Sequence, residues 1–171
     1  MLSPWKGNQA MPAETPSPPY RPLQHTVRLG PSVWAGVLIG VGIAAFVDET
    51  VFHQLLHWHH FYDKSTPAVG LVSDGLFHAF GWAAVVIGLV WVAVLRRPAA
   101  LFGRALVAGI LLGTGGFQLY DGTVQHKVLH LHQIRYHVAL LPYDLTWNLL
   151  AVLALIIGGV LLVRARGVSR S

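Results

Sequence analysis

Four long apolar segments follow one another along this chain, and they constrain the fold more than any other feature. Gly75–Leu95 has 21 residues, Leu145–Val163 has 19, and neither contains a charged side chain. The runs 31–47 and 105–120 are also uncharged. About 20 apolar residues are enough for a helix to cross the hydrocarbon core of a bilayer. Each of the four segments is therefore predicted to be a transmembrane helix.

The composition supports a membrane protein and excludes other classes. Hydrophobic residues make up 54% of the chain and charged residues 11%, against about 25% charged residues in an ordinary soluble domain. A disordered chain would need far lower hydrophobicity. The net charge of +5 does not indicate nucleic-acid binding, because the basic residues lie at the ends of apolar segments and form no basic stripe. Without cysteine, the chain has no disulfide and no thiolate ligand.

The basic residues predict the orientation. Nine of them fall in the N-terminal tail, the link between the second and third segments and the C-terminus, against three on the other side. Because Lys and Arg are enriched in cytoplasmic loops, both termini are expected in the cytoplasm. We therefore predict an all-α fold with a Pro-rich cytoplasmic tail (1–30), a four-helix transmembrane domain (31–166) and a short cytoplasmic tail (167–171).

The chain also contains an internal repeat. With an offset of 73 residues, 11 of the 24 positions from Gly36 to His59 are identical to those from Gly109 to His132. The second and fourth segments match more loosely, at an offset of 70. The pattern predicts two tandem two-helix repeats, about 31–97 and 101–166, related by a pseudo-twofold axis along the membrane normal.

Each repeat carries one G-x-x-x-G motif, formed by Gly36 and Gly40 in the first and by Gly109 and Gly113 in the second. This spacing lets two helix backbones approach closely. We expect the motifs to pack helices within the bundle; a homodimer interface is the alternative.

Histidine provides the main functional indication. Nine of the ten histidines lie between His53 and His137, and both repeats contain the motif D-x4-H-x3-H-x-H. In a straight helix, His53 and His57 would share one face, whereas Asp48 and His59 would lie on another. One straight helix therefore cannot direct all four groups at one ion. Either the helix unwinds near Trp58, or the two faces have different roles.

Ionisable groups inside a membrane are costly and indicate function. Imidazole and carboxylate without sulfur suit divalent Cu, Zn, Fe or Mn. The predicted metal ligands are Asp48, His53, His57, His59, His78, Asp121, His126, His130 and His132. The groups predicted to support these ligands by hydrogen bonds are Glu49, His60, Asp74 and Asp144. Axial haem ligation, a proton relay and a purely structural polar network are the alternatives.

Three stretches carry a resemblance to a known family. They are the pattern from Gly40 to His60, the stretch from Ser73 to Phe80, and Tyr120 to His132. Together they resemble a bacterial family of four-span membrane proteins catalogued as a domain of unknown function. The resemblance implies a multi-pass protein of the bacterial inner membrane. It further implies genomic association with respiratory-oxidase assembly and copper-handling proteins, which are candidate partners besides the lipid bilayer.

The sequence thus predicts an integral membrane protein that binds a divalent transition metal on the outer side, with a role in metal handling for respiratory enzymes. The alternative is a membrane oxidoreductase with a dinuclear metal centre or a haem. Both would use the same ligands, so the sequence does not decide whether the protein is an enzyme.

Overall fold

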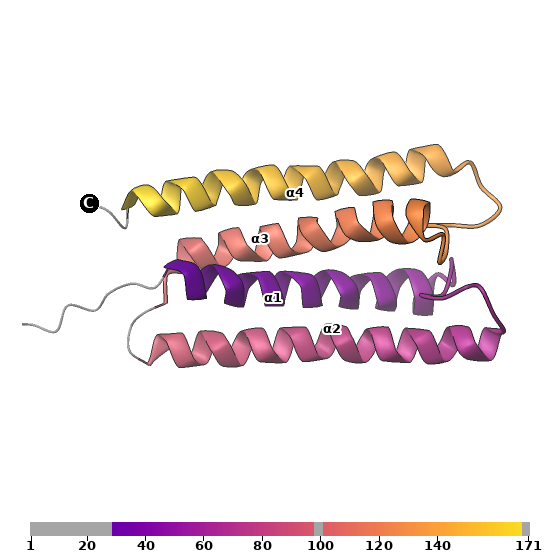
Figure 1. Ribbon diagram of the computed structural model, residues 1–171, viewed down its shortest axis with the longest axis horizontal. Coiled ribbons are helices and arrows are strands. Elements are labelled where there is room, and N and C mark those ends of the chain that lie inside the picture. Colours follow the sequence, from indigo (N-terminus) through magenta and orange to yellow (C-terminus); the bar gives the residue numbers. More distant parts are fainter. Residues whose placement is uncertain (1–28, 98–100, 169–171) are drawn as a thin grey trace, which may run out of the picture.

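The computed structural model describes residues 29–97 and 101–168, which form four long helices, two of them continuing into π-helical segments (Figure 1). In chain order the elements are α1 (Leu29–Asp48), η1 (Glu49–Leu55), α2 (Pro67–Arg96), α3 (Gly103–Tyr120), η2 (Asp121–Val128) and α4 (Leu140–Val168). No strand occurs in these two ranges, and the all-helical prediction is confirmed. The predicted tails lie outside the described residues, except that 29–30 belong to α1 and 167–168 to α4.

The helices lie in the order α2, α1, α3, α4, with α1 and α3 in the middle (Figure 1). The middle helix α1 packs on α2 and α3, and α3 packs on α1 and α4. The π-helical segments and the two loops that follow them lie at one end of the bundle, and the end of α2 and the start of α3 lie at the other (Figure 1). The polar motifs of both halves are therefore brought to the same end.

Glycines set the close contact between α1 and α3. A Cβ atom added to Gly36 would lie 2.2 Å from the carbonyl oxygen of Leu106, and one added to Gly109 would lie 2.1 Å from that of Val33. Gly40 and Gly113 meet the opposite backbone at 2.1 and 2.3 Å in the same way. Any side chain here would separate the helices. The expected packing role of the G-x-x-x-G motifs within the bundle is confirmed.

The surface is that of a protein surrounded by lipid. The buried apolar side chains are mostly alanines, whereas large ones such as Trp82, Leu89, Leu153 and Ile156 are exposed. Large exposed apolar surfaces are rare on soluble monomers, and a bilayer would cover this one. Within the described ranges, three helical stretches are long and apolar enough to cross a membrane: Leu29–Leu55, Pro67–Arg96 and Leu140–Gly167.

The third predicted span differs from the other three. Helix α3 has 18 residues, about 27 Å at 1.5 Å per residue. It is not among the stretches apolar enough to qualify. Arg104, Gln118 and several glycines lower its hydropathy. The position of α3 explains this composition, because a helix packed between α1 and α4 needs small residues more than lipid-facing ones.

Two helices begin earlier than the apolar runs indicate. Helix α2 begins at Pro67 rather than Gly75, and the Thr66 hydroxyl accepts a hydrogen bond from the Val69 amide at 3.4 Å. Threonine before a helix and proline in its first turn are favourable start signals. Helix α4 begins at Leu140, with Pro142 in its first turn, where proline is tolerated. Asp74 and Asp144 therefore lie inside their helices rather than at the ends.

Candidate metal centre

At the polar end of the bundle, α1 and α3 both widen into a π-helix. This change begins after Asp48 in the first half and after Tyr120 in the second. The segments close with matching backbone hydrogen bonds, from Leu56 to Val51 at 2.9 Å and from Leu129 to Val124 at 2.8 Å. π-Helical turns are rare and frequently mark functional sites.

Directly after each π-helix the chain reverses at a histidine. His57 has φ 50° and His130 has φ 49°, a left-handed conformation that non-glycine residues seldom adopt. These turns bring His59 and His132 back under the helix ends, where they are 6% and 2% exposed. The alternative that the helix unwinds near Trp58 is therefore what the structure shows. Strained backbone of this kind persists where the surroundings require it.

Four buried histidine rings meet between the two halves. The ring centroids of His53 and His59 are 4.4 Å apart, and those of His126 and His132 are 4.7 Å apart. His59 and His132 stack on each other at 4.5 Å with an interplanar angle of 5°. The four rings thus form one cluster, to which each half contributes two.

Hydrogen bonds fix the protonation of two of these rings. The Nδ1–H of His59 donates to the Ile134 carbonyl at 3.0 Å, and that of His132 donates to the Phe61 carbonyl at 2.9 Å. A carbonyl only accepts, so Nδ1 carries a proton, and in the neutral ring the lone pair is then on Nε2. Both Nε2 atoms are buried without a hydrogen-bond partner. This tautomer and its backbone partner are typical of a metal-ligating histidine.

The surroundings keep His59 neutral. Burial, followed by the nearby imidazole of His132, lowers the pKa of His59 to about 2. A neutral imidazole retains the lone pair that a metal needs.

Two buried carboxylates complete the cluster. Asp48 Oδ2 lies 3.8 Å from His53 Nε2. Asp121 lies closer to its histidines, with 3.2 Å from Oδ2 to His126 Nε2 and 3.6 Å from Oδ1 to His132 Nε2. Two overlapping sets of donor atoms each lie within 4.8 Å of one another: Asp48 with His53 and His59, and His59 with His126 and His132. A divalent ion about 2.0 to 2.2 Å from each donor fits such spacing.

Behind His53 is a second layer of acidic groups. The Nδ1 atom of His53 lies 2.9 Å from Glu49 Oε2 and 3.1 Å from Asp74 Oδ1. Asp74 also accepts hydrogen bonds from the Phe61 amide at 2.7 Å and from His60 Nδ1 at 2.6 Å. Glu49, His53 and Asp74 form a third group with metal-binding spacing. Since Asp74 is already satisfied by these donors, we interpret it as a group that orients His53.

The predicted site residues divide into three sets. Those in the central cluster are Asp48, His53, His59, Asp121, His126 and His132. Those behind His53 are Glu49, His60 and Asp74. The remaining four lie away from the cluster: His57 and His130 are exposed, His78 packs against the Phe46 ring at 5.4 Å, and Asp144 pairs with Lys127 at 2.5 Å.

The expected pairing of His53 with His57 on one helical face was wrong. It assumed a regular helix through both residues, whereas the helix ends at Leu55 and the left-handed turn at His57 follows. The ring that joins His53 is therefore His59. The same correction applies to His126, which meets His132 and not His130.

The sequence also missed some partners of the cluster. Gln125 is buried, and its amide donates to Asp121 Oδ1 at 2.9 Å. Its counterpart in the first half is Phe52, so the repeat gave no signal; only the spacing of four residues from Asp121 could have indicated it. The carbonyls of Phe61 and Ile134 belong to the backbone, and no side chain identifies them.

Comparison with known families places this chain. Residues 35–165 match the model of a family described as a predicted membrane protein, DUF2243. The chain belongs to this family. No curated protein and no solved structure matches it. The matched range contains both π-helices and all six residues of the central cluster, while the family's description assigns no activity. The function must be inferred from the site.

Proposed function

We propose that this protein is an integral membrane protein that binds a divalent transition metal in the central cluster. The observation that carries the proposal is the unused capacity of buried histidines to bind a cation: the Nε2 atoms of His53, His59 and His132 have no hydrogen-bond partner, and that of His126 has only Asp121 beside it, at 3.2 Å. An unsatisfied buried polar group costs roughly 1 to 3 kcal/mol. Such groups beside two buried carboxylates are a costly arrangement for the empty protein, which bound metal would relieve.

The donor set favours Zn, Cu(II), Fe or Mn. It consists of imidazoles and carboxylates, and the membrane part has no sulfur ligand, which disfavours Cu(I). Asp48 with His53 and His59, and Asp121 with His126 and His132, are two sets of the same composition. We therefore propose capacity for two ions, which also keeps a dinuclear oxidoreductase as the second candidate function. Haem is less compatible, because the stacked His59 and His132 rings are in contact.

We further propose four membrane spans, built by tandem duplication. Paired contacts support the duplication: His59 binds the Ile134 carbonyl as His132 binds that of Phe61, and Gly36 meets Leu106 as Gly109 meets Val33. Each partner is offset by 73 residues. The asymmetry of basic residues favours a metal centre on the outer side of a bacterial inner membrane, with cytoplasmic termini. Metal delivery to respiratory enzymes, with their assembly proteins as partners, rests on the family resemblance.

Elemental analysis of purified variants tests the proposal. His59→Ala and His132→Ala should each remove a ligand and lower the bound metal at least tenfold. The matched control is His57→Ala, because His57 lies two residues from His59 but is exposed. It should retain the wild-type metal content. Visible spectra of the same samples test for haem. Equal metal content in all three variants would contradict the proposal.

A further inference from the structure

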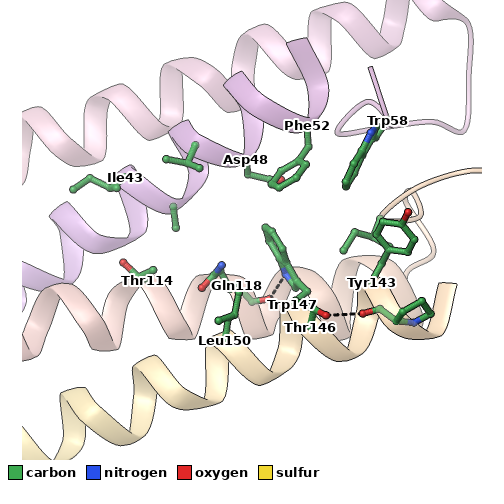
Figure 2. A pocket seen from close by; sticks show the side chains of 14 residues that line it. Ile43, Asp48, Phe52, Trp58, Thr114, Gln118, Tyr143, Thr146, Trp147 and Leu150 are labelled. Atoms are coloured by element: carbon green, nitrogen blue, oxygen red, sulfur yellow. Dashed lines mark hydrogen bonds between the residues drawn. The ribbon is translucent and has the colours of Figure 1, made fainter. Parts of the chain in front are cut away.

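A cavity of about 670 Å³ lies beside the cluster, between α1 and α4 (Figure 2). It exists because both helices pack on α3 rather than on each other. Ile43, Val47 and Leu150 line it and are 44, 47 and 53% exposed on the sides of the bundle, so its entrance faces the lipid. Asp48 also lines it and lies 3.8 Å from His53 Nε2. The cavity therefore leads from the bilayer to the central cluster.

Aromatic side chains form one wall of the cavity. Phe52 contacts Trp58 and Trp147 with centroid distances of 5.0 and 5.6 Å, and Trp58 meets Tyr143 at 5.6 Å (Figure 2). Trp147 is held by its Nε1–H, which donates to the Gln118 carbonyl at 2.9 Å. The Arg135 guanidinium lies 4.8 Å from the Trp58 ring. A rigid aromatic wall favours a planar ring over a flexible alkyl chain, because rings gain offset or edge-to-face contacts.

The polar groups of the cavity include several hydrogen-bond acceptors, beside the Gln118 carboxamide, which both donates and accepts. The hydroxyl of Thr114 donates to the Gly40 carbonyl at 3.1 Å and that of Thr146 to the Pro142 carbonyl at 2.8 Å, which leaves their oxygens to accept. The Asp48 carboxyl group also lines the cavity and keeps an acceptor oxygen whether or not it is protonated. Such a lining can accept a hydrogen bond from a ligand that carries a donor, such as a hydroxyl group.

The other half of the bundle provides a comparison. A second cavity, of about 540 Å³, is lined at the equivalent positions by Val41, Leu76, Phe77 and Phe80 in place of Thr114, Thr146, Trp147 and Leu150. Its lining includes no carboxylate. Although both cavities face lipid, the first alone combines an aromatic wall with a carboxylate of the metal cluster.

We propose that the first cavity binds a lipid-soluble planar ring that carries a hydroxyl group, of the phenol or hydroquinone class. The hydroxyl donates to Asp48, the ring lies against the aromatic wall, and an alkyl substituent extends into the bilayer. The volume falls in the range of small-molecule sites. This inference deepens the proposed function, since a bound metal would be adjacent to the hydroxyl, but ligand binding itself does not need the metal.

The test measures binding of radiolabelled 6-decyl-2-naphthol to the full chain in phosphatidylcholine nanodiscs. Leu150→Trp should fill the cavity and weaken binding at least tenfold. Phe80→Trp, at the equivalent position of the second cavity and similarly exposed, is the matched control and should leave binding unchanged. Equal loss in both variants, or no saturable binding to the wild type, would overturn the proposal.

Two further comparisons test the hydroxyl contact, both in chelated protein. Asp48→Leu removes the acceptor and should weaken naphthol binding about tenfold, the usual effect of losing one hydrogen bond. Asp144→Leu, at an acidic residue outside both the cavity lining and the central cluster, should not weaken it. The methyl ether of the probe and oleic acid should bind at least tenfold more weakly than the naphthol. If either binds equally well, the cavity is a lipid-tail site and the proposal fails.

The failures of the two proposals are distinguishable, because metal content is measured on the same preparations. Naphthol binding to a protein that takes up no metal would end the metal proposal alone. Metal uptake without naphthol binding would end this inference alone.

Discussion

The two halves of the bundle contribute the same residue types to the central cluster but surround them differently. In the first half, His53 Nδ1 is close to both Glu49 and Asp74. In the second half, the Nδ1 atom of the equivalent His126 is buried without a hydrogen-bond partner. Carboxylates behind a ligating histidine fix its orientation and raise its basicity. The first half is therefore better prepared to hold a metal than the second.

Two substitutions explain the difference. Gly122 replaces Glu49, and a Cβ there would lie 2.7 Å from Trp147 and 2.9 Å from the Asn148 amide. Lys127 replaces Gln54 and pairs with Asp144, the counterpart of Asp74. The two halves thus share the donors of the centre and differ in the groups behind them. A symmetric sequence motif does not ensure two equivalent sites.

The largest effect is expected where the halves are alike, at the contact between α1 and α3. Gly40→Ala and Gly113→Ala should each lower the free energy of unfolding by about 3 kcal/mol. Overpacking typically costs about 1 to 3 kcal/mol, and the upper end applies here because the added methyl group meets backbone rather than a movable side chain. Unfolding in detergent by increasing SDS measures the change. Gly75→Ala and Gly116→Ala, where nothing lies within 4 Å of the added Cβ, are the controls. Clearly unequal losses in the first pair would show that the two halves differ in packing as well.

The metal centre should respond unequally to equivalent substitutions. Asp74→Asn weakens the support of His53 and should lower metal affinity about 10 to 100-fold, the usual range for such partners. Asp144→Asn should change it less than threefold, because Asp144 pairs with Lys127 and not with a histidine. Competition titrations with a chelating dye measure both. Similar losses in the two variants would contradict the proposed inequality of the halves.

The stability of the metal-free protein should depend on pH through His59. Burial lowers the pKa of His59 in the folded state to about 2, whereas the unfolded value is about 6.5. The folded state thus binds fewer protons, so this stability is present above pH 6.5 and is lost as the pH falls toward the folded pKa. At pH 5 the loss attributable to His59 is about 2 kcal/mol. Chelated wild type should lose more stability between pH 7 and 5 than chelated His59→Gln; equal losses would exclude His59 as the cause.

Much of the fold was accessible from the sequence. Apolar length and charge-free runs predicted the helices, and the spacing of glycines predicted close helix packing within the bundle. Both features can be read from the local sequence. The start of α2 was missed because Asp74 and Ser73 interrupt the apolar run, although Asp74 is fully buried against the cluster. A polar side chain that finds hydrogen-bond partners inside the protein cannot be distinguished, from the sequence alone, from one that ends a membrane span.

The candidate site was only partly accessible. The repeat identified Asp48, His53, His59 and their counterparts, since equal spacing in two segments is visible without a structure. It could not separate His59 from His57, because that choice depends on a π-helix and a left-handed turn. These are backbone features set by the packing of both halves. The regular helical geometry used for the prediction therefore selected the wrong neighbour.

The smallest effect is expected from making the second half resemble the first at its ion pair. Lys127→Gln introduces the residue found at position 54 and removes the contact with Asp144. Lys127 is 41% exposed at its side chain, and ion pairs that contact solvent contribute about 0 to 1 kcal/mol. The free energy of unfolding should therefore change by less than about 1 kcal/mol. Metal affinity should change less than threefold, because position 122 remains a glycine, so that no carboxylate equivalent to Glu49 lies behind His126.

The same SDS and dye titrations measure both quantities, with Gln54→Lys as the reciprocal variant. This variant places a cation beside Glu49 and Asp74, to which Gln54 now donates, and should weaken metal binding more than Lys127→Gln does. A larger effect of Lys127→Gln would mean that the second half, not the first, controls metal affinity.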